Sequence, residues 1–543
     1  MTELTPQAPK RGESVPFWRD IRVLGVLAQI AFLIVVITGF SWIVRNVTQN
    51  MSTLGSSQFL CSDGTSSFRC AFDFLRLDAS FAISESLIPY SPSDSYARAL
   101  LVGALNTIKV SFLGIILATL LGTVTGIARL SSNWLVSSVA RWYVDIIRNT
   151  PLLLQLFFLF FAVILAFPPI KDAIQPFGLP IYLSQRGIDL PWPVLMPSFR
   201  TWLIFLVAGA ALGAVVWRWL GRRQREMERD VHRLRWFLVV FLVVAVVGWF
   251  VASALAADNQ GFLAPESSGI TDIADLEAAV RAELGLEDLS ELDAAVADGT
   301  LSAEQVEAAT VRVCAVQGDK KPETNLDAEL RRANIPFSMS RARDMARASA
   351  AYAAGDCDIL VADQATLSAE LAGISATLPS AIVPVREIPI RISIPRIEGL
   401  NFVGGIKLSP NFAAILIGLT IYTGAFIAEI VRAGIQSVAR GQTEAARALG
   451  LSETQRLRLV VLPQALRVII PPLTSQYLNL TKNSSLAIAV GYPDLWSTAF
   501  TTLNQSGRAI QVFLIAMGTY LFFSLTISAF LNWYNRRVAL VER

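Results

Sequence analysis

The feature that most constrains this chain is a set of apolar runs long enough to cross a lipid bilayer. A helix needs about 20 residues to span the hydrocarbon. Only 16% of the 543 residues are charged, whereas soluble proteins carry about a quarter. We therefore predict an all-α polytopic membrane protein. Eight spans fit, at roughly 21–45, 97–128, 150–168, 201–220, 235–257, 409–432, 464–490 and 508–533.

Lysine and arginine near the ends of the spans predict the orientation of the chain. They gather in the N-terminal tail (1–20), in two loops (221–235 and 432–467) and in the C-terminal tail. With eight spans all four segments fall on one side of the membrane. We expect that side, with both termini, to be cytoplasmic.

The segment between the fifth and sixth spans then lies outside. From 258 to 378 it holds 22 acidic and 9 basic residues, a net charge of −13. All four cysteines also fall on the outer side, and an even number in an oxidising compartment suggests disulfides. Four unpaired thiols are the alternative. The disulfide candidates are Cys61, Cys70, Cys314 and Cys357.

Signatures of catalysis are not found in the sequence. No G-x-x-x-x-G-K-[ST] phosphate loop occurs, so nucleotide hydrolysis is not expected in this chain. The single histidine, His232, lies in a basic loop, and no metal-ligand spacing is present. We predict neither an enzyme nor a metal site or cofactor in this chain.

The stretch EAARALGLSETQRLRLVVLP (444–463) predicts two short helices around a glycine. Thr443 is a candidate N-cap, and Gly450 stands where a left-handed residue ends a helix. Ser452 with Gln455 forms a capping box for the second helix, which Pro463 is expected to stop. A DNA-binding helix-turn-helix has similar signals. That interpretation fails because spans pin this short loop to the bilayer, so we expect no nucleic-acid partner.

The same stretch resembles the coupling loop of permease subunits of binding-protein-dependent ABC importers. The resemblance rests on the pattern E-A-A-x-x-x-G followed by L-P, and it implies contact with an ATPase. A generic pair of interfacial helices is the alternative. The implied coupling residues are Glu444, Ala445, Ala446, Gly450, Leu462 and Pro463.

Four longer stretches, 103–131, 148–163, 422–452 and 480–491, are similar to the polar amino-acid branch of that family (histidine/glutamine permease-like). The resemblance implies a permease core with additions. The core parts are 97–168 and 405–534, with the coupling loop at 437–463. The additions are a cytoplasmic tail (1–20), an extra first span (21–45), an extra pair of spans (201–257) and an acidic periplasmic insert (258–378).

The resemblance implies a permease subunit of an ATP-driven amino-acid importer in the bacterial inner membrane. A dimer of ABC ATPase subunits, holding ATP and magnesium, is the implied partner. A second permease (a paralogue or a second copy) and a periplasmic amino-acid-binding protein complete the system. A hypothesis of another class is a membrane-anchored amino-acid sensor, with the outer segment as receptor and 444–463 as output.

The seventh span is unusually polar, and polar groups in hydrocarbon must face protein or water. By resemblance, its stretch around residue 482 lies along the translocation path, with Asn483-Ser484 replacing the family's usual Asp-Thr. Packing between helices is the alternative. The path candidates are Gln476, Asn479, Lys482, Ser484 and Ser485.

Four charged positions near other spans leave alternatives open. Glu429 and Arg432 are three residues apart and are expected to pair along one helix face. Lys109 and Arg129 are ambiguous, and Lys109 either lines the path or reaches an interface.

Residues 310–372 alternate between strand and helix patterns: a strand at 311–318, a helix at 325–334, then helix, strand and helix over 341–371. The stretches VCAVQG and GDCDILVADQATL resemble part of one lobe of a periplasmic amino-acid-binding protein. Asp363 stands where such proteins meet a substrate ammonium. The usual Gly-Thr-Thr is replaced by Gly-Asp-Lys-Lys (318–321), which favours a docking lobe over a working receptor.

Overall fold

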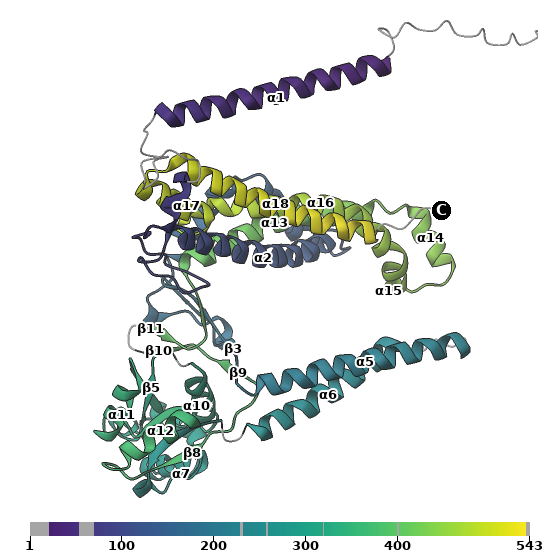
Figure 1. Ribbon diagram of the computed structural model, residues 1–543. Coiled ribbons are helices and arrows are strands. Elements are labelled where there is room, and N and C mark those ends of the chain that lie inside the picture. Colours follow the sequence, from purple (N-terminus) through teal and green to yellow (C-terminus); the bar gives the residue numbers. More distant parts are fainter. Residues whose placement is uncertain are drawn as a thin grey trace, which may run out of the picture. The chain divides into compact units, whose positions relative to one another are not determined.

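The structure, a computed structural model, describes residues 21–53, 70–227, 232–256, 259–318, 320–398 and 401–538. The chain divides into two units. One unit, the helical core, consists of Met1–Leu159 with Ala414–Arg543, and the other, the insert, consists of Phe160–Ala413. Figure 1 shows long helices in the first and a mixture of helices and strands in the second.

The predicted spans of the helical core fold as helices. Seven helices among the described residues of the chain are long and apolar enough to cross a membrane, and a bent pair raises this to as many as eight. The predicted polytopic helical fold is thus confirmed. The helices of this unit are α1 (Ile21–Thr53), α2 (Tyr96–Ala128), α3 (Trp134–Arg148), α4 (Leu152–Phe157), α13 (Pro410–Gln436), α14 (Arg440–Ala448), α15 (Glu453–Arg456), α16 (Leu462–Asn483), α17 (Leu495–Ser506) and α18 (Ala509–Val538).

The third predicted span, at 150–168, is helical from Leu152 to Ile164 and follows a sharp bend in the chain. The helical pair Trp134–Arg148 and Leu152–Ile164 is bent by 107° at a short break. Pro151 lies in extended backbone before α4, and Gln155 Nε2 crosses the break to donate to the Ile147 carbonyl at 2.9 Å. The break falls at Pro151, where the sequence analysis starts the span, because proline and its predecessor do not readily continue a helix.

Glycines let the helices of the core approach closely. A Cβ on Gly122 of α2 would lie 2.6 Å from Ile427 Cβ of α13, and one on Gly126 would lie 2.7 Å from the Ala428 carbonyl. Contacts of this kind are typical of helices in membranes, where there is no hydrophobic gain from leaving lipid. They fix α2 against the helix that leads into the loop at 437–463.

The insert begins with short helical turns and three short strands, continues into two long apolar helices, and ends in a mixture of helices and strands. Its helices are α5 (Phe199–Met227), α6 (Arg233–Leu255), α7 (Ile273–Leu284), α8 (Leu292–Ala297), α9 (Ala303–Ala308), α10 (Lys320–Arg332), α11 (Met345–Ala353) and α12 (Gln364–Ile374). Its strands are β1 (Tyr182–Ser184), β2 (Gly187–Leu190), β3 (Trp192–Leu195), β4 (Gln260–Pro265), β5 (Val311–Val316), β6 (Phe337–Ala342), β7 (Ile359–Asp363), β8 (Ser380–Pro384), β9 (Ile390–Ser393), β10 (Arg396–Glu398), β11 (Asn401–Val403) and β12 (Ile406–Leu408).

Five strands form one sheet in the order β6-β5-β7-β4-β8. Its side chains alternate between two hydrophobic clusters, as the period of two in a strand requires. Val313 of β5 packs with Leu276 of α7 and Leu330 of α10 on one face. Cys314 packs with Tyr352 of α11 on the other. This sheet with its helices, here called the α/β lobe, contains the elements that the sequence predicts: a strand at 311–318, a helix at 325–334, and a helix, a strand and a helix over 341–371.

The remaining strands pair in three small sheets: β1-β2-β12, β3-β9 and β10-β11. We call them the base strands. They combine residues from both ends of the insert, since β2 pairs with β12 in antiparallel register and β3 with β9. Pairing of this kind brings the two places where the insert joins the rest of the chain close together.

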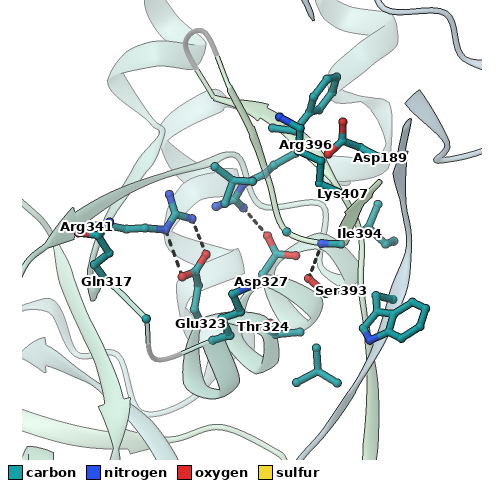
Figure 2. A pocket seen from close by; sticks show the side chains of 18 residues that line it. Asp189, Gln317, Glu323, Thr324, Asp327, Arg341, Ser393, Ile394, Arg396 and Lys407 are labelled. Carbon is teal, nitrogen blue, oxygen red and sulfur yellow. Dashed lines mark hydrogen bonds and ion pairs between the residues drawn. The ribbon is translucent and has the colours of Figure 1, made fainter. Parts of the chain in front are cut away.

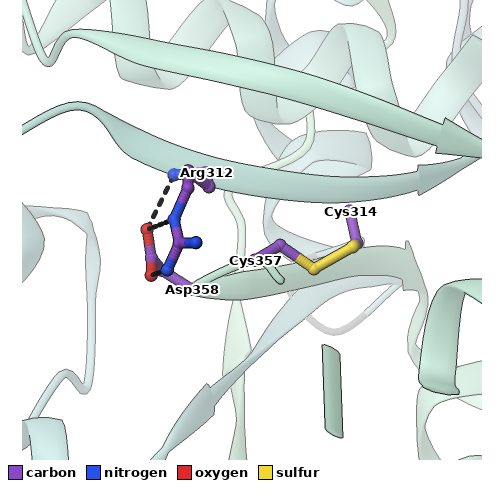
Figure 3. Close-up of a disulfide and its surroundings, with 4 residues drawn as sticks. All are labelled: Arg312, Cys314, Cys357 and Asp358. Atoms are coloured by element: carbon purple, nitrogen blue, oxygen red, sulfur yellow. Dashed lines mark hydrogen bonds and ion pairs between the residues drawn. A yellow bond between two sulfur atoms is a disulfide. The ribbon is translucent and has the colours of Figure 1, made fainter. Parts of the chain in front are cut away.

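One of the two suggested disulfides is present in the α/β lobe. Cys314 and Cys357 are joined by a disulfide with a Cα–Cα distance of 5.8 Å (Figure 3). The Arg312 guanidinium donates to Asp358 beside it at 2.7 Å, so β5 is tied twice to the segment before β7. Cys70 is also disulfide-bonded. Cys61 lies outside the described residues.

Candidate functional site

The loop at 437–463 contains the two helices that the sequence predicts, joined at Gly450. Gly450 has φ +72°, in the left-handed region. The N–H of Leu451 reaches back to the Ala446 carbonyl at 3.1 Å, which closes the end of α14. The prediction for Thr443 was wrong. Helix α14 starts three residues earlier, and the Thr443 hydroxyl donates to the Arg440 carbonyl within the helix.

The second helix starts as predicted and ends differently. Ser452 and Gln455 form the capping box. Pro463 does not stop the helix; it is the second residue of α16. A π-helical turn, Leu457–Val461, joins α15 to α16. Residues Glu453–Val490 therefore make one continuous helical run.

The exposed face of this loop is polar and leucine-rich. Glu444, Ala445 and Gly450 are exposed, as are Leu462 and Pro463. Ala446 is instead 3% exposed, so it packs inside the loop. Leu449, which the sequence analysis did not select, is 81% exposed beside the glycine. An apolar side chain held outward by a rigid turn is suited to a partner's cavity.

Glu429 lies at the centre of an ion-pair cluster near the start of this loop. It pairs with Arg432 along α13, as the sequence predicts, with the Arg432 Nε donating at 3.3 Å. It also pairs with Arg129 at the end of α2, and Arg148 at the end of α3 lies 3.9 Å away. Three helices thus meet on one carboxylate. Both arginines were noted in the sequence analysis, but not their pairing with Glu429, since Arg129, for example, is 300 residues away from it in the chain.

The polar side chains of α16 divide between two faces. Ser475, Asn479 and Lys482 are exposed, and their spacing of four and three residues places them on one face of the helix. We call these three residues the polar stripe. It includes two of the predicted path residues, and Ser475 was not among them.

The other three predicted path residues do not belong to the stripe. Gln476 is half-buried at its border, and Ser485 lies beyond the end of α16, donating to the Lys482 carbonyl at 2.8 Å. Ser484 is fully buried and donates to the Thr481 carbonyl. Its hydroxyl is committed inside the bundle, so the structure separates Ser484 from the polar stripe.

A second polar group joins helices α2, α17 and α18. The Thr107 hydroxyl accepts from the Leu495 N–H at 2.9 Å, and the Tyr520 hydroxyl donates to Asp494 at 3.0 Å. Lys109 forms an ion pair with Glu85 at 3.2 Å, which favours a role at an interface over one in the path. These contacts fix the end of the bundle opposite the loop.

In the α/β lobe, the carboxylate of Asp363 caps α12. It accepts from the Thr366 N–H at 3.0 Å and from the Thr366 hydroxyl at 2.6 Å. Asp319, the first residue that differs from the usual Gly-Thr-Thr of binding proteins, lies outside the described residues. The Asp363 carboxylate is therefore engaged within its own helix.

Comparison with known proteins gives the class of this polytopic protein. Residues 371–540 match the family described as the inner membrane component of binding-protein-dependent transport systems. The amino-acid ABC transporter permease protein YhdX of Escherichia coli (strain K12) is 32% identical over 95% of this chain and 94% of its own length. The chain belongs to this family of ABC transporter permeases and is a multi-pass inner-membrane transport subunit.

Two further relatives match over nearly the full chain. The general L-amino acid transport system permease protein AapQ of Rhizobium johnstonii is 30% identical over 96% of this chain and 94% of its own length. The glutamate/glutamine/aspartate/asparagine transport system permease protein BztB of Rhodobacter capsulatus is 33% identical over 96% of each chain. A crystal structure of an amino acid ABC transporter with histidines covers 81% of this chain and 95% of its own, with 15% identity and a TM-score of 0.35.

Proposed function

We propose that this permease carries amino acids inward and that the loop at 437–463 is the lever through which a separate ATPase drives it. The observation that carries the proposal is the continuous helical run Glu453–Val490. It joins the exposed loop directly to the polar stripe. The run has no break between the loop and the stripe, so a partner that moves the loop would move the stripe.

The polar stripe supports a role in the translocation path. Asn479 and Lys482 are exposed on this chain, and in hydrocarbon such groups are stable only against protein or water. A second permease subunit facing the stripe would supply both a partner surface and an aqueous path between the two chains.

The proposed arrangement places the loop and both termini in the cytoplasm, because the arginine-rich segments share one side. ATP and magnesium would be held by a dimer of ATPase subunits, and this chain would perform no catalysis. A periplasmic amino-acid-binding protein would deliver the substrate. The sensor hypothesis draws no support from the relatives, all of which are named as transport permeases.

A matched pair of glycine substitutions tests the lever. Gly450 and Gly441 both have open space where a Cβ would lie, but only Gly450 has a positive φ. Gly450→Val should therefore distort the turn, whereas Gly441→Val should fit on the surface of α14. In cells with the complete transporter, we expect amino-acid uptake to fall about tenfold or more in Gly450→Val and to stay near wild type in Gly441→Val.

The amount of permease in the membrane is measured in parallel, so that loss of protein is separated from loss of coupling. Cross-linking from Ala445, which is exposed, should capture an ATPase subunit in the wild type; Ala446 is unsuitable because it is buried. Normal uptake in Gly450→Val at full membrane level would contradict the proposal. Normal uptake together with altered transcription would favour the sensor.

A further inference from the structure

The insert contains a pocket of about 400 Å³ between the α/β lobe and the base strands. From the lobe, it is lined by the end of β5, the first turns of α10 and Arg341 of β6. From the base strands, it is lined by Asp189 of β2, Arg396 of β10 and Lys407 of β12. Figure 2 shows these side chains around one space. All of them belong to one unit of the chain.

Most of the charges around the pocket are already paired. The Arg341 Nε donates to Glu323 at 3.1 Å, and Arg396 pairs with Asp327 (Figure 2). Both carboxylates are on α10, and both arginines come from other elements. These ion pairs hold α10 against β6 and β10, so the wall of the pocket is rigid and close to neutral.

Asp189 differs from these carboxylates. It is 1% exposed, and its Oδ2 has no hydrogen-bond partner in the part of the chain that the structure describes. Lys407 stands directly opposite it in the antiparallel ladder between β2 and β12. Their charged atoms are not within 4.0 Å, since neither residue has an ion-pair partner among the described residues. A buried carboxylate without a partner is costly.

A separated carboxylate and ammonium, both lining one pocket, match a molecule that carries the opposite charges side by side. We propose that this pocket binds a free α-amino acid, with the substrate ammonium on Asp189 and the substrate carboxylate on Lys407. Trp192 and Phe402 also line the pocket, and they offer an apolar surface to the side chain of the bound amino acid. The choice of an amino acid over other zwitterions rests on the proposed function.

The site would hold substrate on the insert, apart from the path along α16. Its two binding groups come from β2 and β12, at opposite ends of the insert's sequence, and the wall comes from the α/β lobe. Occupancy would therefore tie the lobe to the base strands, because each contributes to the same pocket.

The test uses the purified full-length chain in lipid nanodiscs, without ATPase or binding protein. Labelled L-alanine, L-glutamine and L-glutamate are added one at a time, and bound ligand is measured at equilibrium. We expect one saturable site for at least one of them. Asp189→Asn and Lys407→Gln should each weaken binding about tenfold or more, because each removes one charge-assisted contact.

Three controls make the result specific. Glu287→Gln removes an exposed carboxylate of the same lobe and should leave binding unchanged. Glu304→Gln removes a second exposed carboxylate of the lobe and should also leave binding unchanged. Ethylamine and propionate, the two halves of alanine's charge pair, should fail to compete. Thermal unfolding of each variant establishes that it is folded.

No binding of any of the three amino acids, with uptake by the complete transporter intact, would overturn this inference and leave the proposed function standing. Unchanged affinity in a folded Asp189→Asn chain would also overturn it. Competition by ethylamine as strong as that by alanine would show a plain cation site instead. If uptake itself were absent from the wild type, the proposed function would fail, whatever the binding result.

Discussion

The helical core and the insert differ in how their elements approach one another. In the core, α2 meets α13 through glycines whose missing side chains leave backbone and branched side chains in contact. In the insert, a sheet with alternating apolar faces packs against helices on both sides. The first arrangement depends on close fit and the second on removing apolar surface from water. Substitutions should therefore act through different physical terms in the two regions.

The two regions also differ in how they place charge. The core gathers three arginines around Glu429. The insert distributes pairs such as Arg341–Glu323 and Arg396–Asp327 between elements. It also retains Asp189, whose Oδ2 has no partner among the described residues. Satisfied charges hold structure together, whereas a buried charge without a partner indicates a place for a ligand.

The largest effect is expected from opening the disulfide of the α/β lobe. The bridge joins cysteines 43 residues apart, and a loop of that length stabilises the folded state by about 4 kcal/mol. Cys314→Ser should therefore raise hydrogen exchange strongly in β5 and β7, with little change in α2 and α13. A reducing agent added to the wild type should reproduce the pattern. Equal protection with and without the bridge would contradict the expectation.

A bulky residue at a close contact should have the next largest effect, and it should act on the core. Gly122→Val would place a Cβ 2.6 Å from Ile427 Cβ, and overpacking of this kind costs about 3 kcal/mol. In detergent, the Gly122→Val variant should unfold and aggregate at a lower temperature than the wild type. Gly518→Val of α18 has open space at the Cβ position and is the control. Similar melting of both variants would show that the contact between α2 and α13 is not tight.

Removing the central carboxylate of the arginine cluster should have a smaller effect. Glu429→Gln leaves Arg129 and Arg432 without a charged acceptor and should cost about 2 kcal/mol. Since the cluster lies where α13 leads into the loop, uptake should fall as well. Glu453→Gln removes a 70% exposed carboxylate that pairs only at the surface of the loop, so its effect on stability should stay below about 0.5 kcal/mol. Equal effects of the two substitutions would refute the distinction.

The smallest expected effect is a dependence of the stability of the base strands on pH. Burial raises the pKa of the Asp189 carboxyl to about 6, against the opposing influence of Lys407. The folded state therefore holds this proton more tightly than the unfolded state, in which the pKa is near 3.8. Its stabilising contribution is complete below about pH 4 and declines as the pH rises through 6. The loss from pH 5 to pH 7 should be about 1 kcal/mol.

Hydrogen exchange in β2 and β12, measured without ligand at pH 5, 6 and 7 and corrected for intrinsic rates, should show this decline. The other charged groups around the pocket are Glu323, Asp327, Arg341 and Arg396, which pair with one another, and Lys320. Asp189→Asn should flatten the profile. A profile that kept its slope in that variant would assign the titration to another group.

The sequence by itself determined the features that depend on local order along the chain. Apolar runs, the left-handed Gly450, the capping box at Ser452 and the strand at Val311 follow from hydrophobic periodicity and backbone preference. Those forces act over a few residues, so they can be recognised without a structure. Thr443 and Pro463 show the limit of such rules: each residue suits more than one position at a helix end, and packing of the surrounding turns selects one.

Only the tertiary structure decided which distant residues meet. It brought Arg129 and Arg148 to Glu429, turned Ser484 inward while leaving Asn479 and Lys482 exposed, and placed Asp189 opposite Lys407. The physical reason is that burial and charge pairing depend on distances between elements, which the spacing of residues in sequence does not encode. The polar stripe and the pocket of the insert are sites of this second kind.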